Sequence, residues 1–415
     1  MKPENTVAVH TVVALCATGA EKFVSNELKK MGLSVSDSGY GRVRFRSDTA
    51  GLYRALIGLR AADRLLLEVG FFSADDFDTL FDVAKNIPWE TFVPARMGLK
   101  VTKVRTNRST LRAETSIQSM VHKAAAIRLC ESCGLVRLPE TGNEAEVRVY
   151  IEKNNVSLLL DLSGEPLFKR GYRIEGGAAP LRETTAAAML LLSGWKRKYP
   201  LYDPFCGSGT ILAEAQMYAW DMAPGLGRSF ALSRLLIADS TIEEAVRDEF
   251  RRKVNFERLI RIAGSDGDES SAALALSNLQ RVKDLAEGRK PLFRNGSKQP
   301  NVSQTVLPQI NALPLQSARP PARPPFSAGD TPDGKDEPSG FIITNPPYGK
   351  RLGSREASEQ IYSEMGALAR NFPGWKLVVI TDHPGFESFF GKKAASCREI
   401  SNGPIPSYIY QYEKL

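Results

Sequence analysis

From Tyr199 onward the chain alternates short apolar segments with longer segments of helical periodicity, which is the pattern of a parallel α/β sheet. The first apolar segment ends at Asp203, and a loop with two glycines then leads to a helix expected over Thr210 to Trp220. Ligands of such sheets bind outside the carboxyl ends of the strands. The residues that follow each strand are therefore the candidates for a functional site.

The bulk composition indicates a soluble chain of two or three domains, because 415 residues exceed one ordinary core. Apolar residues make up 42% and charged residues 25%, and the sequence contains no apolar run as long as a membrane span. The polar start MKPENT lacks the profile of a signal peptide. Five scattered cysteines favour a reducing compartment over a disulfide framework. We therefore expect a cytoplasmic protein without a membrane partner.

Residues 1 to 165 mix strands and helices, and the first of them indicate a small β-α-β-β-α-type module. The expected strands here are 7–15, 42–46, 99–105 and a hairpin of 147–151 with 156–160, and the expected helices are 21–31, 50–66, 77–86 and 114–131. Beyond them we expect helices over 184–195, 242–259, 269–280, 357–371 and 385–391, strands over 261–265 and 377–381, and a closing antiparallel pair of 398–400 with 408–412.

The net charge of +8 is moderate, but the basic residues are clustered. Between Arg96 and Arg128 eight lysines and arginines stand against one acid, Glu114. Such a run usually forms a solvated face. It indicates a phosphate-binding surface if the chemistry downstream concerns nucleic acid.

The loop Asp203-Pro-Phe-Cys-Gly-Ser-Gly-Thr210 lies between the first expected strand and its helix. Glycines let a backbone approach a ligand closely, and the start of a helix offers free N–H groups. Leu212 stands where the dinucleotide fingerprint has its third glycine, and the lysine of a P-loop is absent. The acid before the loop suits an amino group, such as that of the methionine part of S-adenosylmethionine.

A second acidic position follows the expected strand 261–265, in the sequence Gly264-Ser-Asp-Gly-Asp268. An acid at the tip of the second strand is where nucleotide-binding sheets hold ribose hydroxyls. We assign the ribose to Asp266, because Asp268 is better placed to cap the next helix.

The stretch Phe341-Ile-Ile-Thr-Asn-Pro-Pro-Tyr-Gly349 is an apolar strand that two prolines end. Asn345 then lies at the carboxyl tip of the strand, and the rigid turn presents Tyr348. An amide acceptor, a stiff backbone and an aromatic ring suit a flat substrate with an amino group, such as a nucleobase.

Other polar residues carry weaker signals. The three histidines are scattered and are interpreted as structural. The pair Cys130 and Cys133 lacks a second pair and lies in an expected helix, so we expect no metal site. Residues 290–340 are rich in proline and polar residues and are interpreted as a flexible surface insertion with one β-like piece at 302–312.

The order of the three motifs resembles the amino-methylating class I methyltransferases that use S-adenosylmethionine. Further motifs, namely Asp161-Leu-Ser-Gly164, Lys169-Arg-Gly-Tyr-Arg173, Ala179-Pro-Leu-Arg-Glu-Thr184 and Ser193-Gly-Trp195, are similar to the bacterial THUMP-containing 23S ribosomal RNA guanine-N2 methyltransferases. The resemblance covers most of residues 5–415, apart from the insertion 290–340. The family has an acid near the cofactor adenine, whereas the matching position here is Asn311.

The resemblance implies an α/β fold with a Rossmann-like class I methyltransferase domain at residues 166–415. It also implies an N-terminal ferredoxin-like module at 1–60 and a THUMP RNA-binding domain at 61–165, both α+β. The implied function is transfer of a methyl group from S-adenosylmethionine to N2 of a guanosine in 23S rRNA. The alternatives are guanine-N2 in tRNA, adenine-N6 in nucleic acid, and a non-catalytic RNA-binding or ribosome-assembly factor.

Each site is thereby given a set of residues. The expected catalytic residues are Asn345, Pro346, Pro347 and Tyr348. The expected cofactor residues are Thr184, Asp203, Phe205, Gly207, Ser208, Gly209, Thr210, Asp266, Asp268 and Asn311. The expected RNA-binding residues are Lys100, Lys103, Arg105, Arg108, Arg112, Lys123, Lys169, Arg170 and Arg173. The expected partner is RNA, either 23S rRNA or an assembly intermediate of the large subunit.

Overall fold

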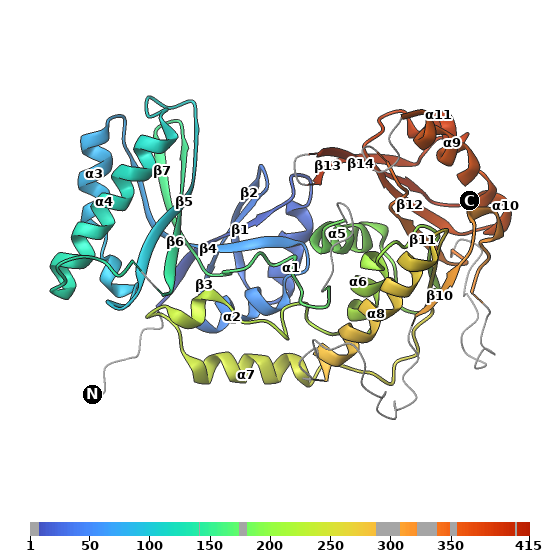
Figure 1. Ribbon diagram of the computed structural model, residues 1–415, viewed down its shortest axis with the longest axis horizontal. Helices are drawn as coiled ribbons and strands as arrows, with labels where there is room; N and C mark the ends of the chain where they lie inside the picture. Colours follow the sequence, from blue (N-terminus) through green and yellow to red (C-terminus); the bar gives the residue numbers. More distant parts are fainter. Residues whose placement is uncertain are drawn as a thin grey trace. The chain divides into compact units, whose positions relative to one another are not determined.

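The computed structural model describes residues 8–140, 142–173, 181–287, 308–321, 338–348, 355–402 and 405–415. These residues form two compact units, each built on a seven-stranded sheet (Figure 1). Unit 1 contains the described residues up to Cys16, Val24–Leu167 and Arg228–Asp248, and unit 2 contains Ala17–Phe23, Phe168–Gly227 and the described residues from Glu249. The chain therefore passes between the units more than once.

The sheet of unit 1 is mainly antiparallel. Its described strands follow the order β2-β3-β1-β4-β7-β6-β5, in which only β5 and β6 run parallel. The strands are β1 (His10–Cys16), β2 (Ser34–Gly39), β3 (Arg42–Ser47), β4 (Ala62–Ser73), β5 (Gly98–Asn107), β6 (Glu144–Glu152) and β7 (Asn155–Asp161).

One face of this sheet is a continuous apolar surface. A row of register partners crosses six strands on that face, and each of its side chains is at most 1% exposed. The row consists of Phe45, Val12, Leu67, Leu160, Val147 and Val101. Because side chains alternate along a strand, the neighbouring residues of every strand lie on the other face.

Four helices bury that apolar face. They are α1 (Glu21–Lys30), α2 (Thr49–Gly58), α3 (Phe77–Asn86) and α4 (Glu114–Cys133), and Figure 1 shows α3 and α4 side by side next to β5, β6 and β7. Asp48 and Asp76 cap α2 and α3 by accepting backbone N–H bonds from Gly51 and Thr79. Gly134, with a φ of 65°, ends α4 in the left-handed conformation.

The helix expected over 50–66 is wrong in its second half. It ends at Gly58, and Ala62–Ser73 forms the central strand β4. The run of leucines in this segment has high helix propensity. Strand pairing overrides it, because β4 bonds to β1 on one side and to β7 on the other.

Residues 228–248 lie far from unit 1 in sequence yet belong to it. The backbone N–H groups of Leu232 and Leu236 donate to the carbonyls of Leu162 and Phe92, each at 2.9 to 3.0 Å. The segment continues into α7 (Ser240–Arg251), which is shorter than the helix expected over 242–259. It thus fastens a late part of the sequence to the N-terminal unit.

The sheet of unit 2 has the parallel core expected from the sequence. Its described strands follow the order β10-β9-β8-β11-β12-β14-β13, parallel from β10 to β12 and antiparallel beyond. The strands are β8 (Leu201–Asp203), β9 (Ile262–Asp266), β10 (Gln309–Ala312), β11 (Phe341–Thr344), β12 (Lys376–Thr381), β13 (Ser396–Asn402) and β14 (Ile405–Tyr412).

Helices cover both faces of this second sheet. On one face Tyr202, Ile342 and Leu377 join a core with residues of the last three helices. The helices of unit 2 are α5 (Glu183–Ser193), α6 (Thr210–Ala219), α8 (Glu269–Ala286), α9 (Arg355–Met365), α10 (Ala367–Asn371) and α11 (Phe386–Phe390). The single helix expected over 357–371 is divided at Gly366. Burial on both faces explains why β11 and β12 are continuous apolar runs.

The architecture confirms the α/β fold class expected from the sequence. The expected domain borders and the THUMP assignment stay predictions.

Of the insertion 290–340, residues 308–321 and 338–340 are described, and 302–307 of the expected β-like piece lie outside the described residues. Within the described part of the chain, none of the helices is long and apolar enough to cross a membrane.

Candidate functional site

Three of the predicted site residues meet at the carboxyl edge of the unit 2 sheet. β9, β8 and β11 are neighbours and run parallel, so their carboxyl ends lie together. These ends carry Asp266, Asp203 and Asn345. Asn345 follows Asp203 by 142 residues and Asp266 by 79 residues in the sequence, and the sheet brings all three to one edge.

The loop after β8 has the tight conformation that its glycines permit. Gly207 and Gly209 have φ values of 51° and 78°, and Gly209 is the N-cap of α6. A Cβ atom on Gly209 would come within 3.0 Å of the Ala275 Cβ atom on α8. A side chain at this position would therefore be strained by its φ and crowded by α8. The loop brings the N-terminal N–H groups of α6 to the sheet edge.

Asp266 fixes this loop to the neighbouring strand. One carboxylate oxygen accepts the N–H of Gly207 at 2.9 Å, and the other accepts the N–H of Asp268 at 3.0 Å. Each carboxylate oxygen has a second lone pair that can accept a ribose hydroxyl. The assignment of the ribose to Asp266 stays a prediction that this arrangement allows.

Asp268 is the N-cap of α8, as its position in the sequence indicated. Its carboxylate accepts the backbone N–H of Ser270 and Ser271 and both of their hydroxyl groups. These hydrogen bonds hold the pKa of Asp268 at about 2. Its role as a cofactor residue stays a prediction.

Asp203 is buried, and it connects the loop to the strand that carries Asn345. Its Oδ1 atom accepts the Thr344 hydroxyl at 2.6 Å and the Phe205 N–H at 3.1 Å. Burial raises the pKa of Asp203 to about 7, although these two hydrogen bonds oppose the shift. A buried carboxyl group of this kind gains from a cationic ligand, since an ammonium group would stabilise its charged form.

Sequence reasoning missed Thr344. This residue ends β11, is fully buried, and directly precedes Asn345. A hydroxyl at the end of an otherwise apolar strand requires a partner, and that requirement was the available signal. Thr344 thus connects Asp203 to Asn345, because it bonds to Asp203 and directly precedes Asn345 in the chain.

Asn345 has an unused hydrogen-bond acceptor. Among the described residues its Oδ1 atom is shielded from solvent and has no hydrogen-bond partner. An unpaired buried carbonyl oxygen costs free energy, on the order of 1–3 kcal/mol. Pro346, next in the chain, is buried, and Pro347 and Tyr348 are half-buried. The arrangement thus provides an acceptor beside a rigid turn and an aromatic ring.

The basic residues of the segment 169–173 divide into two environments. Lys169 is exposed to solvent. Arg173, in contrast, donates to the Thr210 hydroxyl at 2.5 Å and lies 3.4 Å from the Glu183 carboxylate. Arg170 is 3% exposed, and its Nε atom donates to the buried Glu214 at 3.1 Å. The prediction that Arg170 binds RNA is therefore wrong, because its guanidinium group is enclosed by the protein and already paired.

The other expected cofactor residues lie around the same loop or next to it. Thr184 is buried in α5, and Phe205 packs against the core of the sheet. The carbonyl of Ser208 accepts the Asn278 side chain at 2.9 Å. Asn311 lies near the end of the edge strand β10, opposite Ser265 and one residue before the partner of Asp266. It therefore lies one strand beyond the ribose position.

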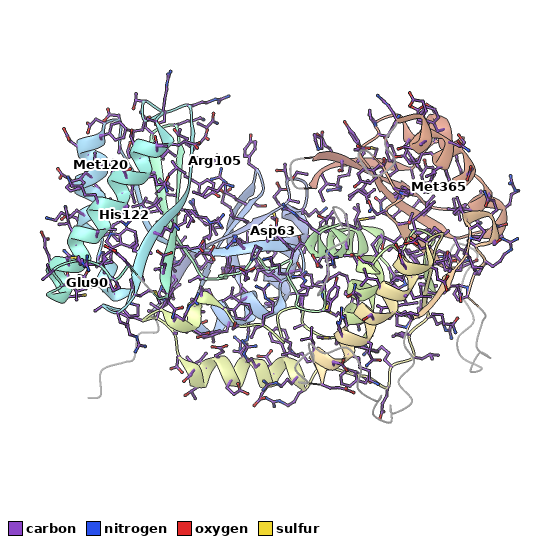
Figure 2. All side chains as sticks on the ribbon, in the orientation of Figure 1. Asp63, Glu90, Arg105, Met120, His122 and Met365 are labelled. Atoms are coloured by element: carbon purple, nitrogen blue, oxygen red, sulfur yellow. The ribbon has the colours of Figure 1, made fainter. Side chains whose placement is uncertain are left out.

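The expected RNA-binding residues of unit 1 do not share one surface. Lys103 and Arg105 are on β5, on the face away from the helices, whereas Lys123 is exposed on α4. Figure 2 labels Arg105 and, on α4 beside Lys123 in sequence, His122 on opposite sides of the strands. Lys100, Arg108 and Arg112 are also exposed. A continuous basic run in the sequence is thus divided between the two sides of a sheet.

Comparison with known families gives two matches. Residues 170–287 and 315–411 match the family described as RMKL-like, methyltransferase domain. Residues 11–66 match the RlmL ferredoxin-like domain, which confirms the ferredoxin-like module expected at the N-terminus.

Curated relatives match nearly the whole chain. YpsC of Bacillus subtilis (strain 168), provisionally named as an RNA methyltransferase, is 32% identical over 405 residues, which are 97% of this chain and 96% of YpsC. The ribosomal RNA large subunit methyltransferase K/L of Cellvibrio japonicus is 30% identical over 97% of this chain, which spans 51% of that protein.

Two solved structures have the same fold over 98% of this chain. SMU.472, provisionally assigned as a methyltransferase and crystallised with SAH, is 30% identical over 98% of its own length, with a TM-score of 0.82. A protein of Listeria monocytogenes, described as a predicted N6-adenine-specific DNA methylase, is 32% identical over 96% of its length, with a TM-score of 0.81.

Proposed function

The chain belongs to the RMKL-like methyltransferase family, and from that membership we propose that it methylates the exocyclic N2 of a guanosine in 23S rRNA. The methyl donor is S-adenosylmethionine. The solved relative crystallised with SAH, the demethylated form of this cofactor, supports the donor. The K/L relatives named as ribosomal RNA large subunit methyltransferases support the substrate.

The Oδ1 atom of Asn345, which has no hydrogen-bond partner in the described part of the chain, carries the proposal. An exocyclic amine of a base is a poor nucleophile, because its lone pair is delocalised into the ring. The Asn345 oxygen and the Pro346 carbonyl accept the two amine hydrogens, which draws the nitrogen toward tetrahedral geometry and directs its lone pair. The buried oxygen then gains a hydrogen bond, whereas it has no partner among the described residues.

Tyr348 holds the base, and the substrate enters as an unpaired or flipped nucleotide. Stacking of a base on an aromatic ring contributes roughly 1–3 kcal/mol. A base inside a duplex cannot reach a strand tip, so it is turned out of the helix first. Positioning of the amine by Asn345, Pro346 and Tyr348 supplies most of the acceleration.

The residues at the edge of the sheet fit the cofactor. When bound, S-adenosylmethionine supplies a methyl group on a positively charged sulfur, so the reaction needs neither a metal nor a covalent enzyme intermediate. The Asp203 carboxyl group holds the amino group, Asp266 holds the ribose, and the loop Gly207–Gly209 lies against the methionine part. The raised pKa of Asp203 supports this role, since a cationic partner restores its charged form.

The test is transfer of labelled methyl from S-adenosylmethionine to unmodified 23S rRNA and, separately, to tRNA, followed by nucleoside analysis. We expect N2-methylguanosine in the rRNA. Recovery of N6-methyladenosine would overturn the guanine assignment, and labelling of tRNA alone would overturn the rRNA assignment. A protein that binds neither S-adenosylmethionine nor SAH would be a non-catalytic factor.

A further inference from the structure

The residues proposed to hold the base do not distinguish guanine from adenine. Asn345 and Pro346 accept the hydrogens of an exocyclic amine, which both bases carry, and stacking on Tyr348 suits any base. The two bases differ at N1, the ring atom beside the carbon that bears this amine. Guanine has an N–H donor at N1, whereas adenine has a lone pair there. A residue that contacts N1 would therefore select between them.

The strand β12 reaches further toward the carboxyl edge than its neighbour β11. Thr344, the last residue of β11, pairs with Val379, and β12 continues to Thr381. Asp382 thus stands three residues beyond this last pair, and Asn345 stands one residue beyond it. Since neighbouring strands lie about 4.8 Å apart and each residue advances about 3.3 Å, the two backbone positions are roughly 8 Å apart. Both side chains can reach the edge of one base.

The backbone on both sides of Asp382 is held in place by buried side chains. The Thr381 hydroxyl accepts the His383 N–H at 3.1 Å and is hydrogen-bonded to the Tyr362 hydroxyl at 2.8 Å. The Nδ1 atom of His383 accepts the Gly385 N–H at 2.9 Å. Thr381 and His383 are 0% and 6% exposed. Asp382 therefore lies in a turn whose geometry is fixed before a substrate binds.

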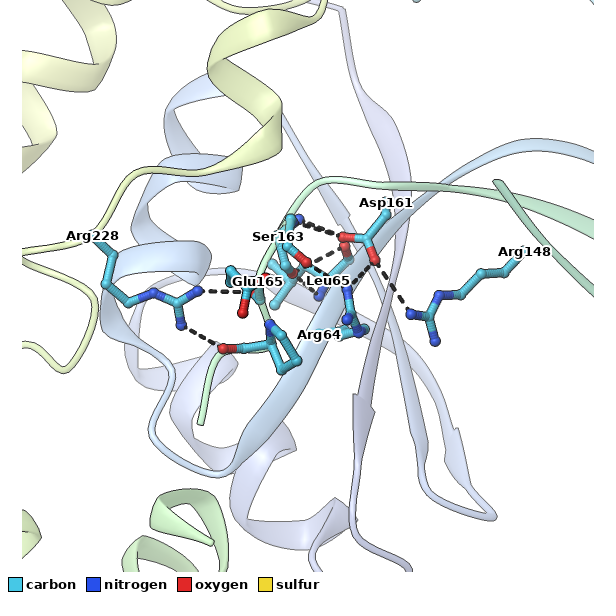
Figure 3. Close-up of polar contacts among 9 residues, drawn as sticks. Arg64, Leu65, Arg148, Asp161, Ser163, Glu165 and Arg228 are labelled. Atoms are coloured by element: carbon cyan, nitrogen blue, oxygen red, sulfur yellow. Dashed lines mark hydrogen bonds and ion pairs between the residues drawn. The ribbon is translucent and has the colours of Figure 1, made fainter. Parts of the chain in front are cut away.

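The carboxylate of Asp382 differs from those of the other aspartates at strand ends. Asp161 ends β7, and its Oδ2 atom lies 2.5 Å from the Arg64 guanidinium (Figure 3). Asp203 and Asp266 accept backbone N–H groups of the loop after β8. Asp382 is half-buried, and within the described part of the chain its carboxylate makes neither a hydrogen bond nor an ion pair. Its oxygens are therefore available to a donor on a ligand.

Asp382 and Tyr348 both influence one buried hydroxyl group, that of Tyr362. Burial raises the pKa of Tyr362 to about 12, and the charges of Asp382 and Tyr348 contribute to this shift. The hydrogen bonds of Tyr362 with Thr381 and Ser358 oppose it. Because the effect of a charge falls with distance, the Asp382 carboxylate lies in the neighbourhood of the ring on which the base is proposed to stack.

We propose that Asp382 determines the base specificity of methyl transfer by accepting the N1–H of guanine. This inference rests on the guanine substrate proposed above. With adenine in the same position, the carboxylate would face the N1 lone pair, and a carboxylate has no hydrogen to donate. Both groups would lose their contacts with water and gain no hydrogen bond in return. A site of this kind rejects a base that lacks the donor.

The test changes N1 of the substrate and leaves the methylated amine in place. The RNA that becomes labelled in the transfer experiment is assembled by ligation with either guanosine or 2-aminopurine at the methylated position. 2-Aminopurine keeps the exocyclic amine but has a lone pair at N1. The ratio of kcat/KM for the two RNAs is measured for the wild type, Asp382→Asn and Asp382→Ala. Since every enzyme acts on the same two RNAs, differences in intrinsic reactivity between the bases cancel.

We expect the wild type to prefer guanosine by about 10²-fold or more. Asp382→Asn should reduce this preference to less than about tenfold, because an amide can donate to the N1 lone pair as well as accept the N1–H. Asp382→Ala should act on 2-aminopurine more slowly than Asp382→Asn, since alanine offers no donor. A purely structural role of Asp382 would lower kcat/KM for both RNAs by the same factor. An unchanged ratio in Asp382→Asn, or a wild type without preference, would overturn the proposal.

The matched control is Asp284→Asn. Asp284 is also a half-buried aspartate of unit 2, but it lies in the last turn of α8. This helix begins at the carboxyl edge with Glu269, and at about 1.5 Å per residue Asp284 lies roughly 22 Å further along it. The control should keep the wild-type ratio. Affinity for SAH, measured by calorimetry, should stay within about twofold of the wild type in all variants, which shows that the cofactor site is intact.

The two proposals fail separately. Methylation of guanosine with an unchanged ratio in Asp382→Asn contradicts the role of Asp382 alone. Methylation of guanosine confined to tRNA contradicts the rRNA substrate alone, and the ratio measured on that tRNA still decides the role of Asp382. Methylation of adenosine at N6 contradicts both.

Discussion

The two sheets of this protein differ in which part is not covered by helices. The unit 2 sheet is parallel at its core and covered by helices on both faces, so its carboxyl edge remains for a ligand. The unit 1 sheet is mainly antiparallel, and its four helices pack on one face. Its other face holds a small buried apolar cluster of Val13, Leu66 and Leu159, with polar and charged side chains around it. The difference shows how strand direction, through the position of the connecting helices, decides where a sheet can bind.

The same contrast appears in the arginines of the two units. In unit 2, Arg170 and Glu214 form an ion pair whose side chains are 2% and 0% exposed. In unit 1, Arg105 and Glu114 form a pair whose side chains are 60% and 45% exposed. A buried pair is expensive to break because the remaining charge lies in a medium of low polarity, whereas water replaces the partner in an exposed pair.

The largest expected effect is on stability. Arg170→Met should lower the free energy of unfolding by about 3–5 kcal/mol, because it leaves the Glu214 carboxylate buried and unpaired. Arg105→Met should lower it by about 0.2–1 kcal/mol. Urea unfolding of both variants measures the difference. Glu214→Met added to Arg170→Met should restore much of the loss, and a failure to do so would mean that packing rather than charge explains the effect.

The second effect is on catalysis at the edge of the unit 2 sheet. Asn345→Ala should reduce kcat for methyl transfer by about 10²–10³-fold, as removal of one preorganised hydrogen-bonding group does in other enzymes. Binding of S-adenosylmethionine, measured by calorimetry, should change by less than about twofold. The matched control Gln360→Ala truncates an exposed amide on α9. Full activity of the Asn345 variant would remove this residue from the mechanism.

A third, smaller effect concerns the glycine loop. Gly209→Ala should destabilise the protein by more than the roughly 1–2 kcal/mol of a left-handed non-glycine residue, because its Cβ atom would also meet Ala275 at 3.0 Å. Gly391 has the same φ of 78° but no neighbour within 4 Å of an added Cβ atom. Gly391→Ala therefore measures the conformational strain alone. Equal melting temperatures of the two variants would contradict the close approach of α8.

A fourth effect is a pH dependence of cofactor binding. The pKa of Asp203 is about 7, so below this pH the free protein carries a proton that an ammonium ligand must displace. Affinity for SAH should therefore fall by up to about tenfold per pH unit between pH 7 and pH 5. Asp203→Asn should bind more weakly and lose this dependence. A wild-type profile that is flat over the same range would show that Asp203 does not hold the amino group.

The accuracy of the sequence predictions varied with how local their signals were. The loop at Gly207 to Gly209 was predicted from two glycines between a strand and a helix, and in the structure both glycines have positive φ values. The strand before Asn345 was predicted from an apolar run that two prolines end, and β11 ends at Thr344. In both cases neighbouring residues in the chain hold the required information.

Predictions that depended on distant contacts were less accurate. The first residues of β4, 62–66, were expected to be helical, because their leucines have high helix propensity and the pairing with β1 and β7 is a long-range contact. Arg170 was assigned to the RNA surface from its place in a basic segment. Its buried partner, Glu214, lies 44 residues away, so the neighbouring sequence did not reveal the ion pair. The basic run between Arg96 and Arg128 suggested one surface. It contains both β5, whose basic side chains lie on the face away from the helices, and α4, which packs on the opposite face.

The sequence by itself determined the α/β class, the glycine loop, the acids after two strands and the Asn-Pro-Pro-Tyr turn, because each depends on local backbone chemistry. The tertiary structure decided which charges are buried and which remain on a surface. It gave Asp203 a raised pKa and left the Asn345 oxygen without a partner among the residues that the structure describes. It also gathered Arg42, Arg64, Lys103 and Arg148 on one face of the unit 1 sheet. Burial and strand register are properties of the whole chain, and they set the electrostatics of both proposed sites.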